Sequence, residues 1–201
     1  MTLETAAIGL AEPVHDSQAV FRVLLDAMSR PGSIHPLPLR PAGAPFAATA
    51  AAVLLTLADH ETTVWLAPDL PGRDEVASFL RFATGTRITA DPDAATFALV
   101  ANLHAMPPLE AFAQGTPEYP DRSTTLVMTV DHVAASASDG GMRLSGPGIA
   151  DLAEFRFDPM PARLAAELLE NRARFPLGVD LVLCAPGAVA ALPRSVRYVG
   201  A

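Results

Sequence analysis

The stretch from Met142 to Leu152, MRLSGPGIADL, holds residues whose types and spacing could bind phosphate. Gly146 and Gly148 follow a strand-like run and precede a segment that can begin a helix, where backbone N–H groups attract anions. The hydroxyl of Ser145 can donate a further hydrogen bond. These features make the loop a candidate phosphate cradle. A structural turn is the favoured interpretation, because Pro147 has no N–H to donate and glycine tolerates positive φ.

Arginine supplies all of the positive side-chain charge, because the 14 basic residues include no lysine. Arg30 and Arg81 lie near the ends of two predicted helices, and their guanidinium groups suit phosphate or carboxylate recognition. We predict both as ligand-binding residues together with Ser145, Gly146 and Gly148. Solubility and surface pairing are the alternative role for such arginines. Without lysine, a Schiff base to pyridoxal phosphate and a Walker-type phosphate contact are both excluded, and we expect no cofactor.

The other titratable residues indicate no metal site and no assignable catalytic residue. The five histidines are scattered and show no spacing that would place two metal ligands on one face. The run Asp59-His60-Glu61 could support acid–base chemistry, or it could be a polar turn between a helix and a strand. Cys184 lies in an apolar run and is predicted to be a small buried hydrophobe rather than a nucleophile.

Charge and hydropathy narrow the classes of partner. The formal net charge is −8, and no basic run exists that would neutralise a nucleic-acid backbone. The N-terminal region lacks the basic segment of a secretory signal. The longest apolar stretch, FAATAAAVLLTLA, is too short to span a membrane. We expect a cytoplasmic protein with one domain over residues 1–201.

Four helices are predicted from apolar spacing and terminal signals. The first opens with Asp16 as N-cap, closes at Pro31-Gly32 and has an apolar stripe of Phe21, Leu24, Leu25 and Met28. PFAATAAAVLLTLAD is apolar on nearly every face, which indicates burial in the core or in a subunit interface. PGRDEVASFLRFATG carries the stripe Val76, Phe79, Leu80 and Ala83. PARLAAELLENRARF begins at Pro161, and a short further helix is expected near 109–113.

The strand signals alternate with these helices and also include two hairpins. TTVWLA and ATFALVA are expected strands, and STTLVMTVDHV is expected to pair with MRLSG through Asp139-Gly140-Gly141. VDLVLCA and AVAAL should form a closing hairpin at Pro186-Gly187. The span HPLPLRPAGAP is predicted to be an extended surface loop. Together these elements predict an α/β protein, a three-layer α/β/α sandwich around a mixed β-sheet.

Several phrases, taken together and in order, resemble the PhnH family, the H subunit of the bacterial carbon–phosphorus lyase system. They are FRVLLDAMSRPG, VLLTLADHETTVWLAP, LRFATGT, ATFALV, GTPEYPDRSTTLVM, RLSGPGIA and FPLGVDLVLC. The resemblance extends from about Met1 to Arg194, and the segment SVRYVGA carries no match.

The resemblance implies a subunit of a core complex for phosphonate breakdown. Such H subunits work with G, I and J subunits. With the G, I and L proteins they support transfer of ribose triphosphate from ATP to methylphosphonate, with release of adenine. The family's fold resembles a truncated pyridoxal phosphate-dependent transferase without the cofactor, and the isolated subunit is a homodimer. No family motif makes any residue of this chain catalytic.

We therefore expect an accessory subunit of a multi-subunit transferase that is not catalytic alone. Two alternatives remain open at this level. The chain could have its own site for a phosphorylated nucleotide or sugar, built from the glycine loop and the arginines, or it could be a purely structural dimer.

Overall fold

The computed structural model describes residues 9–136 and 140–200. Its largest element is a mixed seven-stranded sheet in the order β1-β10-β9-β5-β4-β2-β3. The strands are β1 (His35–Pro36), β2 (Thr63–Leu66), β3 (Arg87–Thr89), β4 (Phe97–Val100), β5 (Thr125–Thr129), β9 (Asp180–Ala185) and β10 (Ala188–Leu192). The five strands from β9 to β3 run parallel, whereas β10 and β1 are antiparallel. The predicted mixed sheet is confirmed, as is the closing hairpin of β9 and β10.

In the described part of the chain, four α-helices and a second sheet accompany the large sheet. The helices are α1 (Pro13–Ser29), α2 (Ala48–Leu57), α3 (Arg73–Thr84) and α4 (Leu164–Ala173), with 3₁₀ turns at Pro92–Ala94 and Leu109–Ala111. The small sheet has the order β11-β7-β8-β6, built from β6 (His132–Ala134), β7 (Met142–Ser145), β8 (Ala153–Asp158) and β11 (Arg197–Gly200). No helix in the described ranges is long and apolar enough to cross a membrane.

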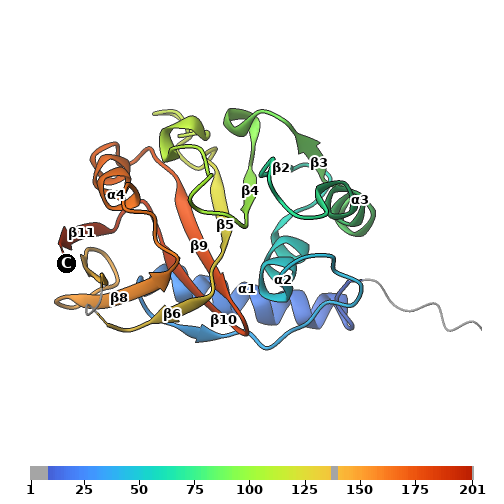
Figure 1. Ribbon diagram of the computed structural model, residues 1–201, viewed down its shortest axis with the longest axis horizontal. Coiled ribbons are helices and arrows are strands. Elements are labelled where there is room, and N and C mark those ends of the chain that lie inside the picture. Colours follow the sequence, from blue (N-terminus) through green and yellow to red (C-terminus); the bar gives the residue numbers. More distant parts are fainter. Residues whose placement is uncertain (1–8, 137–139, 201) are drawn as a thin grey trace, which may run out of the picture.

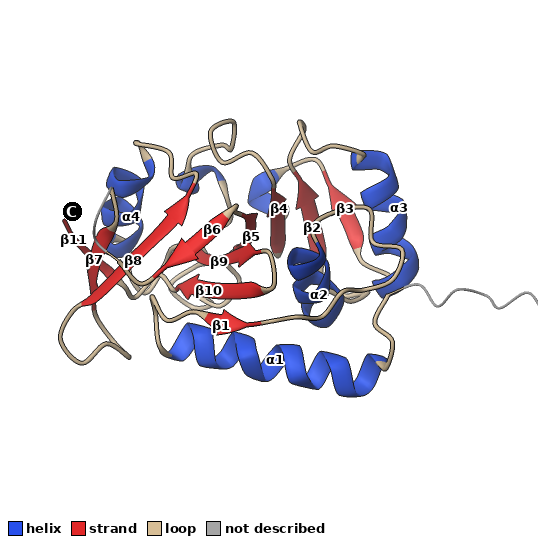
Figure 2. Cartoon of the chain, turned by 60° about the horizontal axis from the view of Figure 1, so that its bottom comes forward, coloured by secondary structure: helices blue, strands red, loops and turns tan. Residues whose placement is uncertain are grey.

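The two sheets occupy different parts of the molecule. Figures 1 and 2 show the small sheet and α4 at one end, α3 at the opposite end and the large sheet between them. Helix α1 runs along the edge formed by β1 and β10 and contacts both strands as well as α2. Helix α2 packs against β5 and β9. The carboxyl ends of the central strands are consequently surrounded by loops from both halves of the chain.

Helix α2 is buried because its sequence offers no polar face. Residues 49–54 are all buried, and half of them are alanine, whose small side chain lets the helix approach the sheet closely. The expectation of burial is confirmed, and the described chain itself supplies the covering surfaces. A subunit interface is not needed to explain the apolar character of α2.

Helix α1 differs from its sequence prediction at its start and on its apolar side. It begins at Pro13, which suits the first helical turn because its missing N–H needs no partner there. Asp16 is therefore not the N-cap; its carboxylate accepts a hydrogen bond from the Glu12 N–H at 2.9 Å. Val20, Leu24 and Ala27 face the core.

The predicted stripe of α1 was wrong at two of its positions. Phe21 is 47% exposed and Leu25 is 53% exposed. The heptad-like spacing of hydrophobic residues does not distinguish two adjacent apolar faces, and in α1 only one of them meets the sheet. A smaller error occurs in α3, where Ala77 is buried and Ala83 is exposed. The expected helix near 109–113 is the 3₁₀ turn Leu109–Ala111.

The predicted hairpin through Asp139-Gly140-Gly141 is wrong. Strand β5 pairs in parallel with β4 and β9, while β6 pairs with β8 and β7 pairs with β8 and β11. The chain leaves the large sheet directly after β5, where the Asp131 N–H donates to the Asp158 carbonyl at 2.7 Å. Strand β6 therefore pairs with β8 instead of with β7, its nearer neighbour in the sequence. Of the expected connection, Asp139 lies outside the described residues, whereas Gly140 and Gly141 are described.

The loop after β7 forms a tight turn against the end of α1. The Ile149 N–H donates to the Gly146 carbonyl at 3.1 Å, with Pro147 and Gly148 between them. Gly148 has φ +82°, and proline followed by a positive-φ glycine is the signature of a type II turn. A Cβ at Gly148 would lie 2.0 Å from the Ser29 carbonyl oxygen. Glycine is thus required here by both φ and close approach.

Replacing Gly148 should destabilise the fold far more than replacing a glycine of similar φ in open space. Gly148→Ala combines the left-handed conformation with a backbone clash, for which we expect a loss of about 3 kcal/mol. Gly140 has φ +85°, and a Cβ added there would meet no atom of the described residues within 4 Å, so Gly140→Ala should lose only about 1 kcal/mol. Urea unfolding of both variants measures the difference. Equal losses would contradict the described packing of the turn against α1.

Candidate functional site

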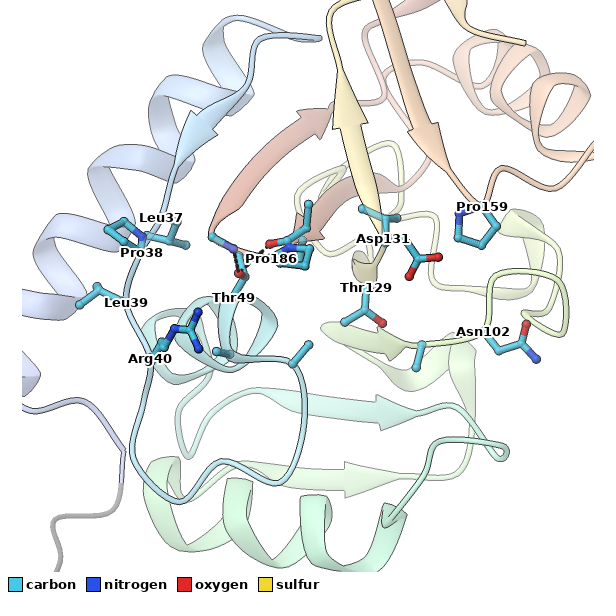
Figure 3. Close-up of a pocket in the computed structure, with 17 residues that line it drawn as sticks. Leu37, Pro38, Leu39, Arg40, Thr49, Asn102, Thr129, Asp131, Pro159 and Pro186 are labelled. Atoms are coloured by element: carbon cyan, nitrogen blue, oxygen red, sulfur yellow. Dashed lines mark hydrogen bonds between the residues drawn. The ribbon is translucent and has the colours of Figure 1, made fainter. Parts of the chain in front are cut away.

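A pocket of about 720 Å³ opens at the carboxyl ends of β4, β5 and β9 (Figure 3). Asn102 follows β4, Asp131 follows β5 and Pro186 follows β9, and all three line it. Parallel strands end at the same edge of a sheet, and ligands of open α/β sheets bind in crevices at that edge. The volume lies in the range typical of small-molecule sites. The sheet order therefore produces a candidate binding site.

The pocket adjoins the point where the order of the parallel strands reverses. After β2 the chain adds β3 on one side, and it then returns to add β4 on the other. The side chains that follow β2 and β4 meet there, because Asn102 Nδ2 donates to Asp69 Oδ2 at 2.9 Å. Diverging loops at such a reversal leave space at the sheet edge.

The first turn of α2 supplies another wall. Ala47, Ala48 and Thr49 line the pocket, and no side chain caps this end of the helix. Thr49 Oγ1 donates to the Ala185 carbonyl at 2.8 Å and accepts from the Gly187 N–H at 3.2 Å. The hydroxyl thus joins the start of α2 to the turn between β9 and β10, so both elements form one rigid wall.

Two charged side chains of opposite sign lie on opposite sides of the pocket. Figure 3 shows Arg40 on one side and Asp131 on the other, with Thr49 and Pro186 between them. Both residues are exposed. Within residues 9–136 and 140–200, neither the Arg40 guanidinium nor the Asp131 carboxylate has a hydrogen-bond or ion-pair partner. Each is therefore available to a ligand.

The remaining polar groups of the pocket have structural roles. Thr129 Oγ1 donates to the Val100 carbonyl at 3.1 Å, which fastens β5 to β4. Burial raises the pKa of the Cys184 thiol, because an apolar environment disfavours the charged thiolate. Cys184 is 2% exposed and thus behaves as the small buried hydrophobe that was predicted.

None of the five predicted ligand-binding residues lines this pocket. Ser145 pairs with Arg197 on β11, and the turn holding Gly146 and Gly148 packs against Ser195 and Ser29. Arg30 is close to this turn in the chain fold, and its guanidinium pairs with Asp26 at 2.8 Å on the exposed side of α1. The structure therefore brings Arg30 and the glycine turn into one region.

Arg81 lies apart from that region. It belongs to α3, which is at the opposite end of the molecule from β7 and β11 (Figures 1 and 2). A single ligand site formed by all five residues has no support in this arrangement. Binding at the glycine turn alone stays a prediction, although the hydrogen bond and packing of the turn account for its shape without a ligand.

The run Asp59-His60-Glu61 forms a polar turn. Asp59 Oδ1 accepts hydrogen bonds from the N–H groups of Glu61 at 2.9 Å and Thr62 at 3.1 Å. The Asp59 carboxylate thus stabilises the turn between α2 and β2. This structural role favours the turn interpretation over acid–base chemistry. Among the described residues, no group of three His, Cys, Asp or Glu side chains could hold a metal ion.

Sequence reasoning missed Arg40 and Asp131 for different reasons. Arg40 lies in the span HPLPLRPAGAP, predicted to be a surface loop, but His35–Pro36 pairs with β10 and Leu37 is buried. Because of that pairing, Arg40 lies close to the carboxyl ends of the central strands, at the pocket. The sequence predicts a continuous strand that contains Asp131 and His132, whereas β5 ends at Thr129 in the structure. A polar residue after an apolar strand was the signal that could have identified it.

Comparison with known proteins gives a consistent result over nearly the whole chain. The family model "Bacterial phosphonate metabolism protein (PhnH)" matches residues 8–199. A protein of Rhizobium meliloti (strain 1021), named alpha-D-ribose 1-methylphosphonate 5-triphosphate synthase subunit PhnH, is 42% identical over 190 residues. That alignment covers 93% of this chain and 92% of the relative.

A second relative carries a related name. The putative C-P lyase subunit protein HtxG of Stutzerimonas stutzeri is 32% identical over 183 residues, which cover 90% of this chain and 84% of the relative. Both relatives are named as subunits of larger assemblies. The match to the family model includes every strand that contributes to the pocket.

The Thr49 hydroxyl offers a test of how the pocket wall is held. Thr49→Val keeps the side-chain shape but leaves the Ala185 carbonyl and the Gly187 N–H without their hydroxyl partner. We expect a loss of about 1–3 kcal/mol in the free energy of unfolding. Thr56→Val, in the same helix, removes only a bond to the Ala52 carbonyl one turn earlier and should cost less than about 0.5 kcal/mol. Thermal unfolding that ranks the two variants in the reverse order would refute this role.

Proposed function

The chain belongs to the PhnH family, and from this premise we propose that it is a subunit of a carbon–phosphorus lyase core complex in phosphonate catabolism. The observation that carries the proposal is the 42% identity to the synthase subunit over nearly the full length of both chains. The match to HtxG, named as a C-P lyase subunit protein, supports the same assignment. We propose subunits of the G, I and J types, and an L-type protein, as partners.

The reaction that we propose for the assembly transfers ribose triphosphate from ATP to methylphosphonate. The bond between C1′ of the ribose and N9 of adenine breaks, and a bond forms between C1′ and a phosphonate oxygen. Adenine leaves with a proton, and the product is ribose 1-methylphosphonate 5-triphosphate. This chain supports the transfer as a component and does not catalyse it alone.

We further propose that residues 1–201 form one domain with the three-layer α/β/α arrangement of a truncated pyridoxal phosphate-dependent transferase. One cluster of buried hydrophobic side chains extends from Val20 to Val196, which supports a single domain. The parallel strands and the contacts of α1 and α2 with the large sheet are compatible with the layered arrangement. The absence of lysine from the sequence means that this chain has no side chain to hold pyridoxal phosphate as a Schiff base.

A second candidate function is a subunit that has its own site for a phosphorylated nucleotide or sugar. The pocket at the strand ends, with Arg40 and Asp131 unpaired among the described residues, favours this function over a purely structural dimeric scaffold. It is compatible with membership of the complex, because a subunit can contribute a ligand site to a shared reaction.

An omission experiment tests the proposed function. The G-, I- and L-type proteins from the same bacterium are assembled with or without this chain, and release of adenine from ATP is measured in the presence of methylphosphonate. We expect release at least about 100-fold faster when the chain is present, since the assembly lacks a component without it. The isolated chain should release none. Equal rates with and without the chain would refute the assignment.

We also propose that the isolated chain is a homodimer joined through the outer face of α1. Val14, Phe21 and Leu25 recur at i, i+7 and i+11, and each is about half exposed or more. These side chains lie on one face of α1, with the exposed Gln18 between Val14 and Phe21, and an exposed apolar helix face marks an interaction surface. No residue of the described chain covers it fully.

Charge along α1 favours a second copy as the occupant of this face. The N-terminal end of the helix carries Glu12 and Asp16, and Arg22 lies in its second half, whereas Arg30 at its end is paired with Asp26 of the same helix. Antiparallel pairing of two α1 helices brings the acidic end of each toward Arg22 of the other. It also aligns the two helix dipoles favourably.

Substituting Leu25 should separate the two copies. Leu25→Glu places a charge in this face, and we expect the dissociation constant of the dimer to rise at least about tenfold. Phe82→Glu is the matched control, because Phe82 is also apolar and 77% exposed but lies on α3. Light scattering over a concentration series should show a shift for Leu25→Glu alone. A monomeric parent protein, or a shift with Phe82→Glu only, would contradict the interface.

A further inference from the structure

The pocket at the strand ends combines two unneutralised charges within one concave space. Arg40 and Asp131 both line its volume of about 720 Å³, and neither has a polar side-chain partner in the described chain. Both side chains are exposed, so a ligand from solvent can reach either of them. Their separation across the pocket, visible in Figure 3, leaves room for a ligand between them.

The side of the pocket at Arg40 is suited to an anion. A guanidinium group presents up to five N–H donors in a planar fork that matches phosphate oxygens. Leu37 and Leu39 line the same part of the pocket and add apolar surface to it. The net charge of −8 would otherwise repel anions, so a local cation is needed for anion binding.

The side at Asp131 is suited to hydroxyl groups. An ionised carboxylate only accepts hydrogen bonds, and its two oxygens can receive two neighbouring O–H groups of a sugar. The carboxylate would repel a second phosphate, so a ligand that fits the whole pocket has its negative charge at one end and hydroxyls at the other. Asp131 is held at this position by its backbone bond to the Asp158 carbonyl at 2.7 Å.

We infer that this pocket binds a phosphorylated sugar, with the phosphate at Arg40 and the sugar hydroxyls at Asp131. The inference deepens the proposed function and rests on it in one respect, because a phosphorylated ribose is the group that the proposed reaction transfers. It assigns the ligand site to the strand ends rather than to the glycine turn. Arg40 and Asp131 are binding residues in this assignment, with no role in bond breaking.

Isothermal titration with ribose 5-phosphate tests the inference on the full chain, alone and in the purified complex. We expect saturable binding, with ribose and inorganic phosphate each at least about tenfold weaker because each makes only one set of contacts. Arg40→Met should weaken ribose 5-phosphate binding at least about tenfold, and Asp131→Ala about fivefold or more. Both side chains are exposed, so the melting temperatures should stay close to that of the parent.

Arg30→Met provides the decisive comparison, because Arg30 lies beside the glycine turn and outside the pocket. We expect this variant to bind ribose 5-phosphate within about twofold of the parent. Loss of affinity in Arg30→Met with normal binding in Arg40→Met would overturn the assigned location. Inorganic phosphate that binds as tightly as ribose 5-phosphate would overturn the sugar ligand, and absence of binding by both preparations would overturn the inference entirely.

The binding test of the pocket and the adenine-release test of the proposed function can fail independently of each other. Failure of ribose 5-phosphate to bind, with adenine release that still requires the chain, would refute the pocket assignment alone. Conversely, adenine release that does not need the chain would refute the proposed function, whatever the pocket binds.

Discussion

The arrangement of this protein depends on burying α2, a helix with no polar face, against the middle of a mixed sheet. A helix of this composition is stable only where other elements cover it on several sides, and α1, α3, β5 and β9 all contact it. Its buried polar group, Thr49, is satisfied by the turn between β9 and β10. Helix, turn and strand ends are thereby held together, and the pocket forms beside them.

The polar residues fall into two groups: those whose hydrogen bonds hold the fold together, and those that are available to a ligand. Buried polar groups such as Thr49 and Asn171 are occupied with backbone partners, as the cost of burying an unpaired group requires. Asp180 and Arg194 likewise form a partly buried ion pair that fastens the segment after β10. Arg40 and Asp131 differ because the fold positions them at the pocket without using their charges.

The elements with strong local signals could be predicted from the sequence. The apolar run of α2, the Val76 and Leu80 spacing of α3 and the Pro186-Gly187 hairpin depend on neighbouring residues, and all were correct. The side of α1 that meets the sheet could not be predicted, because Phe21 and Leu25 are as hydrophobic as Leu24. The pairing of β6 with β8 could not be predicted either, because it joins segments about 25 residues apart through backbone bonds.

The candidate site was the part least accessible to sequence reasoning. The run SGPG is compatible with phosphate binding, because it places glycine and serine near a strand end. Proline followed by a positive-φ glycine is equally typical of a type II turn. Arg40 and Asp131 are far apart in the sequence, and only the sheet order brings them to one pocket. The resemblance to the PhnH family, by contrast, needed no long-range geometry, because its phrases occur in order along the chain, and the comparisons confirmed it.

Hydrogen–deuterium exchange in the presence of ribose 5-phosphate tests most directly where this chain binds its ligand. The amide groups of Ala48 and Thr49 lie in the first turn of α2 and have no hydrogen-bond partner in the described chain, so their exchange should be sensitive to an occupied pocket. We predict slower exchange over residues 38–49 and 129–131 and unchanged exchange over residues 145–149. Protection confined to residues 145–149 and the end of α1 would contradict this assignment and would place phosphate recognition at the glycine turn.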